Sequence, residues 1–128
     1  MSNNQGRCSS SPVIAVACTL ALFLAQSEIT QAKTFTVGEA SGWSFNVQSW
    51  TRGKKFKAGD ALVFNYDPSV HNVAVVDING YNSCSASPSS AVYSSGNDAI
   101  KLSKGRNYFI CSIPGHCDGG LKIAVDAA

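Results

Sequence analysis

The sequence predicts an all-β domain, an antiparallel sandwich or barrel, from three observations. Short apolar runs recur along the chain with turn residues between them. Residues 61–66 alternate so that Leu62, Phe64 and Tyr66 share one face, and residues 72–78 are dense in valine; both patterns are typical of strands. Beyond residue 32, no stretch keeps the period of a helix. Many short strands separated by turns indicate a sandwich or barrel.

The expected strands follow one another closely. They cover residues 34–37, 61–66, 72–78, 99–102, 107–113 and 121–125. Turns are expected at Gly59-Asp60, at residues 67–70 and at Asn79-Gly80, the last being a strong tight-turn signal. The rings of Trp43 and Phe45 are expected to pack in the core or at an end of the barrel.

The first 32 residues are expected to be a secretory signal peptide that is cleaved after Ala32. Residues 1–7 are polar with one positive charge, residues 12–25 are almost uniformly apolar, and residues 26–32 end on Thr-Gln-Ala. The apolar run is shorter than the roughly 20 residues of a spanning helix, which makes a signal anchor the weaker alternative. We expect neither a transmembrane nor a lipid anchor. The working protein is therefore predicted to be one secreted domain, residues 33–128.

The charge pattern bears on the class of partner. The chain has 10 Lys and Arg against 8 Asp and Glu, a formal net charge of +2. Arg52, Lys54, Lys55 and Lys57 fall in one short segment. Because no aromatic stacking array or recognised motif accompanies them, we expect no nucleic-acid partner. A solvated turn is the simplest interpretation, and weak attraction to an acidic partner or cell-wall polymer is the alternative.

An odd number of cysteines remains after the expected cleavage. The chain has 5 cysteines, and removal of residues 1–32 leaves Cys84, Cys111 and Cys117. An oxidising compartment favours one disulfide and leaves one thiol over. A bond from a thiolate to a metal would explain the extra thiol. A buried inert cysteine and an intermolecular bridge are the alternatives.

Two histidines, His71 and His116, lie at a strand end and in a turn. Two imidazoles and one thiolate form the trigonal set of a blue copper site, which a weak axial ligand normally completes. Zinc is the competing interpretation, with Cys111, Cys117 and both histidines as ligands. Against zinc, neighbouring side chains such as those of His116 and Cys117 point apart in extended backbone. If Cys111 holds the metal, Cys84 and Cys117 remain to pair, whereas a bridge from Cys111 to Cys117 would remove the thiolate.

Residues 64–73 (FNYDPSVHNV) and 108–117 (YFICSIPGHC) resemble the phytocyanins, and most closely the plantacyanins or plant basic blue proteins. Similar segments at 42–46, 56–60 and 122–125 extend the likeness over essentially all of residues 33–128. The resemblance implies a cupredoxin fold, a Greek-key β-sandwich with one copper ion at one end. By position, the equatorial ligands would be His71, Cys111 and His116, and the disulfide would join Cys84 and Cys117.

One position departs from the plantacyanin pattern. That pattern has an axial methionine five residues after the second histidine, where this chain has Leu121, and its single methionine is Met1. Axial bonds in these sites are long and weak, so we expect the three equatorial ligands to hold copper without one. A leucine there leaves Cu(II) less well stabilised than Cu(I), which predicts a raised reduction potential.

The predicted function is that of a secreted one-electron carrier. The resemblance implies a monomer in the plant apoplast or cell wall, acting with a protein or small-molecule redox partner that the sequence does not identify. The alternative is an extracellular interaction or signalling module with a structural or vestigial copper site. We do not expect an enzyme, because no H-x-H pairs exist to build further copper centres.

Overall fold

The computed structural model describes residues 31–128. The expected signal peptide, residues 1–32, therefore lies outside the described residues apart from its last two. Residues 32–128 form one compact unit. No helix in the described part is long and apolar enough to cross a membrane.

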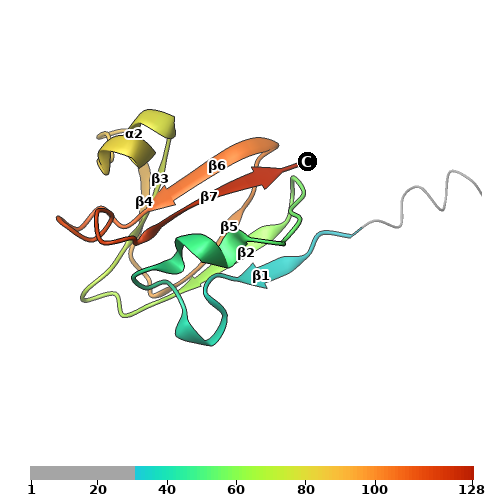
Figure 1. Cartoon of the computed structure of the whole chain (residues 1–128), viewed down its shortest axis with the longest axis horizontal. Coiled ribbons are helices and arrows are strands. Elements are labelled where there is room, and N and C mark those ends of the chain that lie inside the picture. The colour runs from blue at the N-terminus through green and yellow to red at the C-terminus, as the bar shows by residue number, and fades with distance from the viewer. Residues whose placement is uncertain (1–30) are drawn as a thin grey trace, which may run out of the picture. The chain divides into compact units, whose positions relative to one another are not determined.

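Two β-sheets make up this unit, which confirms the predicted all-β sandwich (Figure 1). The first sheet has the order β1-β2-β5, and its strands are Thr34–Thr36, Ala61–Asn65 and Asn97–Lys101. The second has the order β4-β3-β6-β7, and its strands are Ala91–Tyr93, Val73–Val76, Gly105–Ile110 and Lys122–Ala127. Neighbouring strands are antiparallel except β1 and β2, which pair in parallel. The short strand β4 was not expected from the sequence.

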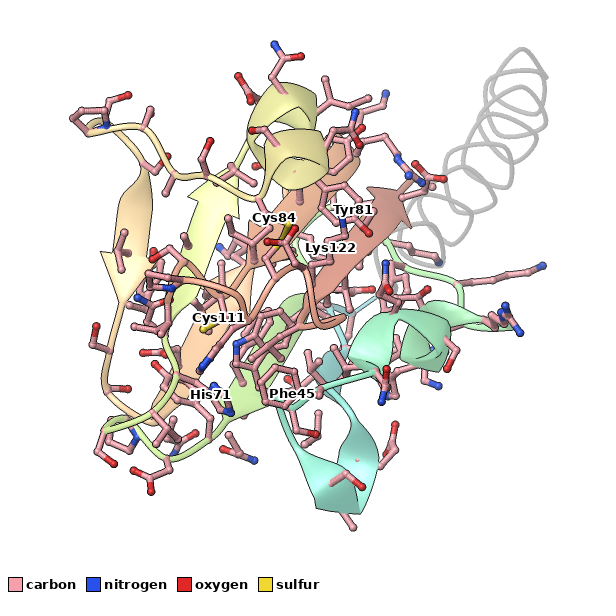
Figure 2. All side chains as sticks on the ribbon, turned by 60° about the vertical axis from the view of Figure 1, so that its left-hand side comes forward. Phe45, His71, Tyr81, Cys84, Cys111 and Lys122 are labelled. Carbon is pink, nitrogen blue, oxygen red and sulfur yellow. A yellow bond between two sulfur atoms is a disulfide. The ribbon has the colours of Figure 1, made fainter. Side chains whose placement is uncertain are left out.

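A short α-helix, α2 (Ile78–Ser83), stands where the sequence predicted a tight turn at Asn79-Gly80. The Asp77 side chain caps this helix by accepting a hydrogen bond of 2.9 Å from the amide of Gly80. A Cβ atom on Gly80 would lie 2.6 Å from the carbonyl oxygen of Ser85, so glycine allows close packing rather than a turn. The helix lies beside the second sheet, where Lys122 donates to the carbonyl oxygen of Tyr81 (Figure 2). The tight-turn prediction is therefore wrong.

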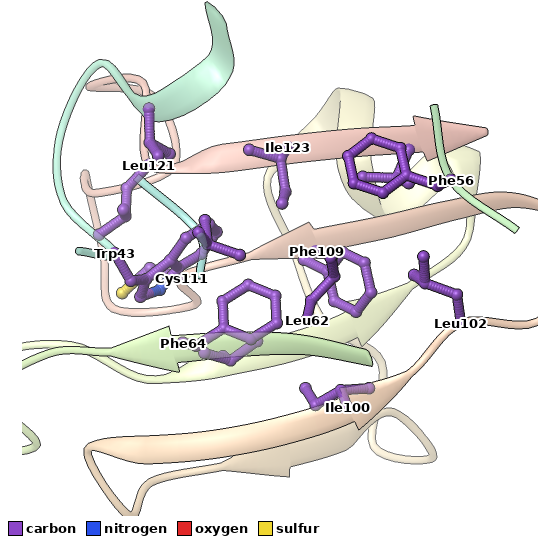
Figure 3. Packing of buried hydrophobic residues seen from close by; sticks show 14 of the residues in the cluster. Trp43, Phe56, Leu62, Phe64, Ile100, Leu102, Phe109, Cys111, Leu121 and Ile123 are labelled. Carbon is purple, nitrogen blue, oxygen red and sulfur yellow. The ribbon is translucent and has the colours of Figure 1, made fainter. Parts of the chain in front are cut away.

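The core lies between the two sheets (Figure 3). In β2, Leu62 and Phe64 point inward and are fully buried, as their alternation predicted. In β7, Ile123 and Val125 are buried in the same way. Two 3₁₀ helices, Glu39–Ser41 and Val47–Thr51, connect β1 to the segment that precedes β2. The side chain of Trp43, which lies between them, is also buried in this core.

The strand directions define two ends of the sandwich. At one end β6 finishes and β7 begins, so residues 111–121, called the site loop below, connect them there. The start of β3 lies at the same end, because Ala74 pairs with Ile110. At the other end β5 and β7 finish and β1, β2 and β6 begin. There, residues 52–60 are tied to the sheets by backbone bonds of 2.9 Å from Ala58 to Ala128 and from Gly59 to Leu102.

Candidate metal centre

Three donor side chains meet at the end of the sandwich that carries the site loop. Cys111 directly follows β6, His116 lies in the site loop, and His71 lies two residues before β3. Their ligand atoms all lie within 4.8 Å of one another. The Nδ1 atoms of the two imidazoles are 3.0 Å apart, and Cys111 Sγ lies 3.6 Å from Nδ1 of His116 and 3.9 Å from Nδ1 of His71. The structure thus brings together residues that are 45 positions apart in the chain.

The site loop turns back on itself between Cys111 and His116. Gly115 has a φ of 83°, which a residue with a side chain rarely adopts, so glycine is suited to this bend. The amide of His116 donates to the carbonyl oxygen of Ile113 at 3.0 Å, and the amide of Leu121 donates to the carbonyl oxygen of His116 at 3.1 Å. These bonds fix the backbone that carries the second imidazole.

Asn72 connects the two segments that supply the donors. Its backbone amide donates to Cys111 Sγ at 3.5 Å. Its side-chain oxygen accepts a hydrogen bond of 2.8 Å from the amide of Ser112, and its side-chain nitrogen donates to the Ser112 hydroxyl at 2.9 Å. The Cys111 side chain is completely buried. Asn72 therefore orients the thiol by bonding to its sulfur and to the next residue, Ser112, a role that the sequence did not indicate.

Burial also affects the first histidine. Loss of solvent lowers the pKa of His71 below its usual value, and electrostatic repulsion from the neighbouring His116 lowers it further. The charge of Asp67 acts in the opposite direction. The neutral form, in which one ring nitrogen keeps a free lone pair, is thereby favoured. Neutral imidazole is the form that binds metals.

Phe45 covers the two imidazoles, although the sequence indicated only a packing role for it (Figure 2). Its ring centroid lies 5.5 Å from that of His71 and 5.1 Å from that of His116, in edge-on geometry. The Phe45 side chain is 46% exposed, so it belongs to the surface rather than to the core. The hydrophobic pattern could not predict that Phe45 contacts the two imidazoles, because alternation indicates which residues are buried and not which residues lie beside a site.

A disulfide joins Cys84 to Cys117, as the family resemblance implied. Its Cα atoms are 5.5 Å apart, and it links residues 33 positions apart in sequence. Cys111 is the free cysteine of the described chain. Two alternatives are excluded by this pairing: a bridge from Cys111 to Cys117, and a four-ligand zinc site that uses the Cys117 thiolate.

Leu121 closes the site loop and is fully buried. It belongs to the same apolar cluster as Cys111 and Trp43, beside which it lies in Figure 3. Its carbonyl oxygen accepts a hydrogen bond of 3.1 Å from the amide of Cys111. The residue thus lies next to the thiol and offers only hydrocarbon from its side chain.

The fold and the donor set together define a class of protein: a Greek-key β-sandwich with a site for one metal ion between two imidazoles and a thiol at one end. A family model, a relative in sequence and two solved structures agree with this class. Residues 42–121 match the model of the plastocyanin-like domain. The chain is 51% identical over 124 residues to a chemocyanin from Lilium longiflorum, with 97% of this chain and 98% of the relative aligned.

Two solved structures are also similar. Cucumber basic protein, a blue copper protein, shares 54% identity with a TM-score of 0.73, over 74% of this chain and 99% of the cucumber chain. Spinach plantacyanin shares 55% identity with a TM-score of 0.67, over 74% of this chain and 99% of the spinach chain. The chain therefore belongs to the plastocyanin-like blue copper proteins, and within them to the phytocyanins that include the plant basic blue proteins. Its cofactor is copper, and His71, Cys111 and His116 are positioned to bind one ion. Membership of the family supports a role as a copper-dependent electron carrier.

Proposed function

We propose that this protein is a secreted one-electron carrier with a single blue copper site held by His71, Cys111 and His116. The observation that carries the proposal is the convergence of one thiol and two imidazole Nδ1 atoms within 4.8 Å. No other residues of the described chain form such a group of possible metal ligands. Copper would supply the redox chemistry by cycling between Cu(I) and Cu(II).

The donor set fits copper better than zinc. Two imidazoles and one thiolate are the trigonal set typical of blue copper, whereas a structural zinc site needs four ligands. The two Nδ1 atoms lie 3.0 Å apart, so a cation between the donors would satisfy both lone pairs at once. The fourth candidate for zinc, Cys117, is already bonded to Cys84.

The surrounding residues would keep the site rigid and dry. Cys111 is buried within the core cluster, and its Sγ accepts from the amide of Asn72, which disfavours movement of the thiolate. The disulfide at Cys117 anchors the site loop to the segment after α2. A rigid site needs little rearrangement when its charge changes by one electron, and this favours fast exchange. Phe45 and the half-buried His116 bring the site close to the surface, where a partner can approach.

We propose that Leu121 occupies the axial position without binding the ion. Its buried side chain lies in one cluster with Cys111 and offers no lone pair. A methionine sulfur there would stabilise Cu(II) more than leucine does, so leucine should raise the reduction potential. The three equatorial donors supply most of the affinity, which is why copper is expected to bind without an axial ligand.

Secretion and the lack of catalytic activity are also part of the proposal. The signal-like pattern of residues 1–32 and the disulfide from Cys84 to Cys117 both suit export to an oxidising compartment. The partner would be a protein or small molecule that exchanges single electrons at the surface near His116, with the carrier acting as a monomer.

Stopped-flow exchange with small redox agents tests this function. The copper-loaded protein should be reduced and reoxidised rapidly and reversibly, with an unchanged circular dichroism spectrum. The His116→Ala variant, folded and supplied with copper, should lose this exchange. A wild-type protein that stays inert or empty would contradict the carrier, and it would favour an extracellular interaction module.

A further inference from the structure

The basic side chains of the described residues gather at the end of the sandwich opposite the site loop. Every Lys and Arg from residue 31 onward lies there except Lys122, which begins β7 near the site loop. The basic end is defined by these residues: Lys33, Arg52, Lys54, Lys55, Lys57, Lys101, Lys104 and Arg106. They come from the start of β1, the segment before β2, the end of β5 and the start of β6. The long side chains of the segment before β2 extend into solvent in Figure 2.

Strand pairing and backbone bonds bring these distant segments together. Lys101 pairs with Ala61 across β2 and β5, next to the backbone of Lys33. Lys54 and Arg106 line the same small hollow, of about 160 Å³. The four parts of the chain that carry these side chains therefore meet at the same end of the sandwich.

Acidic groups do not neutralise this surface. Asp60 is 2% exposed, and its carboxylate accepts hydrogen bonds from the amides of Lys33 and Lys57 at 2.8 and 2.9 Å, so its charge faces the backbone. Asp126 pairs with Arg106 at 3.0 Å, and Glu39 approaches Lys54 at 4.0 Å. Within residues 31–128 these are the ion pairs formed, which leaves six basic side chains of this end outside any ion pair: Lys33, Arg52, Lys55, Lys57, Lys101 and Lys104.

The remaining acids lie outside the segments that form the basic end. Asp67 and Asp98 lie near the ends of β2 and β5 that face the site, Asp118 lies in the site loop, and Asp77 caps α2. The charge of the domain is thus separated along its length. A surface of this kind attracts polyanions and turns the molecule as they approach.

The surroundings of the basic charges indicate the kind of polyanion. The exposed large hydrophobic residues of the described chain all lie outside the segments that supply the basic end: Phe45, Val70, Ile78, Val92, Tyr93 and Ile113. A stable protein interface has an apolar centre, and single-stranded nucleic acids need aromatic platforms for their bases. Two partly buried aromatic residues near these charges are covered by them: the Lys54 ammonium lies 4.9 Å above the ring of Trp50, and the Arg106 guanidinium lies 5.5 Å from the ring of Tyr108. Exposed point charges on a polar surface instead suit a hydrated, flexible chain of carboxylates.

We propose that the basic end binds a linear polyuronate, a polysaccharide with one carboxylate on each sugar. Binding there leaves the opposite end, with Phe45 and His116, free to meet a redox partner. The protein would be retained on an acidic matrix while its metal centre stays accessible. This interaction does not depend on copper, because none of the residues of the basic end contributes to the candidate metal centre.

The test compares two variants of the same net charge. Lys55→Gln with Lys57→Gln removes two positive charges from the basic end. Asn79→Asp with Asn82→Asp adds two negative charges on exposed positions of α2. Copper-loaded wild-type protein and both variants are titrated with polygalacturonate, and with the same polymer after full methyl esterification. Thermal unfolding establishes that each variant is folded.

We expect wild type to bind polygalacturonate with an affinity that falls as salt rises, and to ignore the esterified polymer. The lysine variant should bind at least about threefold more weakly, because it loses two exposed charge pairs of ordinary strength. Its affinity should also depend less steeply on salt. The asparagine variant should bind like wild type. Equal loss in both variants would show that only net charge matters and would overturn the proposal. Tighter binding to a single-stranded polynucleotide of equal charge would overturn the choice of partner.

Discussion

Leu121 is fully buried in one apolar cluster with Cys111, the only free thiol of the described chain. Leu121→Met changes side-chain volume little, so the fold should tolerate it. The added sulfur should stabilise Cu(II), and each tenfold gain in affinity for Cu(II) over Cu(I) lowers the potential by about 59 mV. Potentiometric titration of both proteins measures this. Leu62→Met, a substitution at another fully buried leucine, is the control and should leave the potential unchanged. Equal potentials for wild type and Leu121→Met would contradict the assignment of Leu121 to the axial position.

Phe45 is the surface residue whose ring touches both imidazoles. Phe45→Ala removes this cover, so water gains access to the rings and copper should leave more easily. Aromatic contacts of this kind contribute about 0.5–1.5 kcal/mol, which predicts a roughly twofold to tenfold faster transfer of copper to a chelator. Val70→Ala is the matched control, because Val70 is equally exposed at 47% and precedes His71. Similar rates in the two variants would show that Phe45 has no specific role.

The disulfide acts on whole elements, since it ties the segment after α2 to the site loop. Replacing both Cys84 and Cys117 by Ser should lower the free energy of unfolding by about 3–4 kcal/mol in the chain-entropy model, given a separation of 33 residues. Chemical denaturation of the metal-free protein measures the loss. Copper should still bind the folded variant. A stability equal to that of wild type would mean that the site loop is held by its other contacts alone.

Asp60 ties β1 to the turn that precedes β2 through its two bonds to backbone amides. These bonds hold the pKa of its carboxyl below the usual value of 3.8. Because the folded-state pKa is lowered, the stabilisation is present above the unfolded value and is lost as pH falls through the folded value. Asp60→Asn should cost about 1–3 kcal/mol near neutral pH.

Unfolding curves from neutral to acidic pH test this prediction. The difference between wild type and Asp60→Asn should shrink as the pH falls below about 4. Asp126→Asn serves as the control, because its pair with Arg106 is exposed and should contribute less than about 1 kcal/mol. An Asp60→Asn protein as stable as wild type at neutral pH would contradict the role of the carboxylate.

The strands that could be predicted are those whose burial alternates. Leu62 and Phe64 in β2, and Ile123 and Val125 in β7, carry the period of two that places one face in a core. By contrast, α2 is set by the Asp77 cap and by the tight packing of Gly80, and neither can be distinguished from a turn by local sequence. The parallel pairing of β1 with β2 depends on contacts between distant residues, which periodicity does not encode.

The candidate site, like the fold, has residues that the sequence predicts and residues that it does not. His71, Cys111 and His116 could be found because their residue types and positions match a metal site, and the structure brings them together. The contacts of Phe45 and Asn72 could not be found, since an aromatic ring and an amide beside strands have many ordinary roles. Their function depends on which loop lies opposite them, which only the folded chain determines.

At the scale of the whole molecule, the two ends of the sandwich differ in chemistry. One end carries the donor side chains and the exposed Phe45, and the other carries most of the basic charge. The strands between them hold the two ends apart, because each sheet runs from one end to the other. Attachment to a matrix and electron exchange can therefore take place on the same domain without competing for surface.

Metal analysis combined with the visible spectrum tests the central claim most directly. The protein purified under oxidising conditions and loaded with Cu(II) should contain one copper ion per chain and show an intense visible band from thiolate charge transfer. Cys111→Ser should abolish that band, because it removes the only free thiol of the described chain. A colourless copper-loaded wild type, or a band that persists in Cys111→Ser, would contradict the blue copper site.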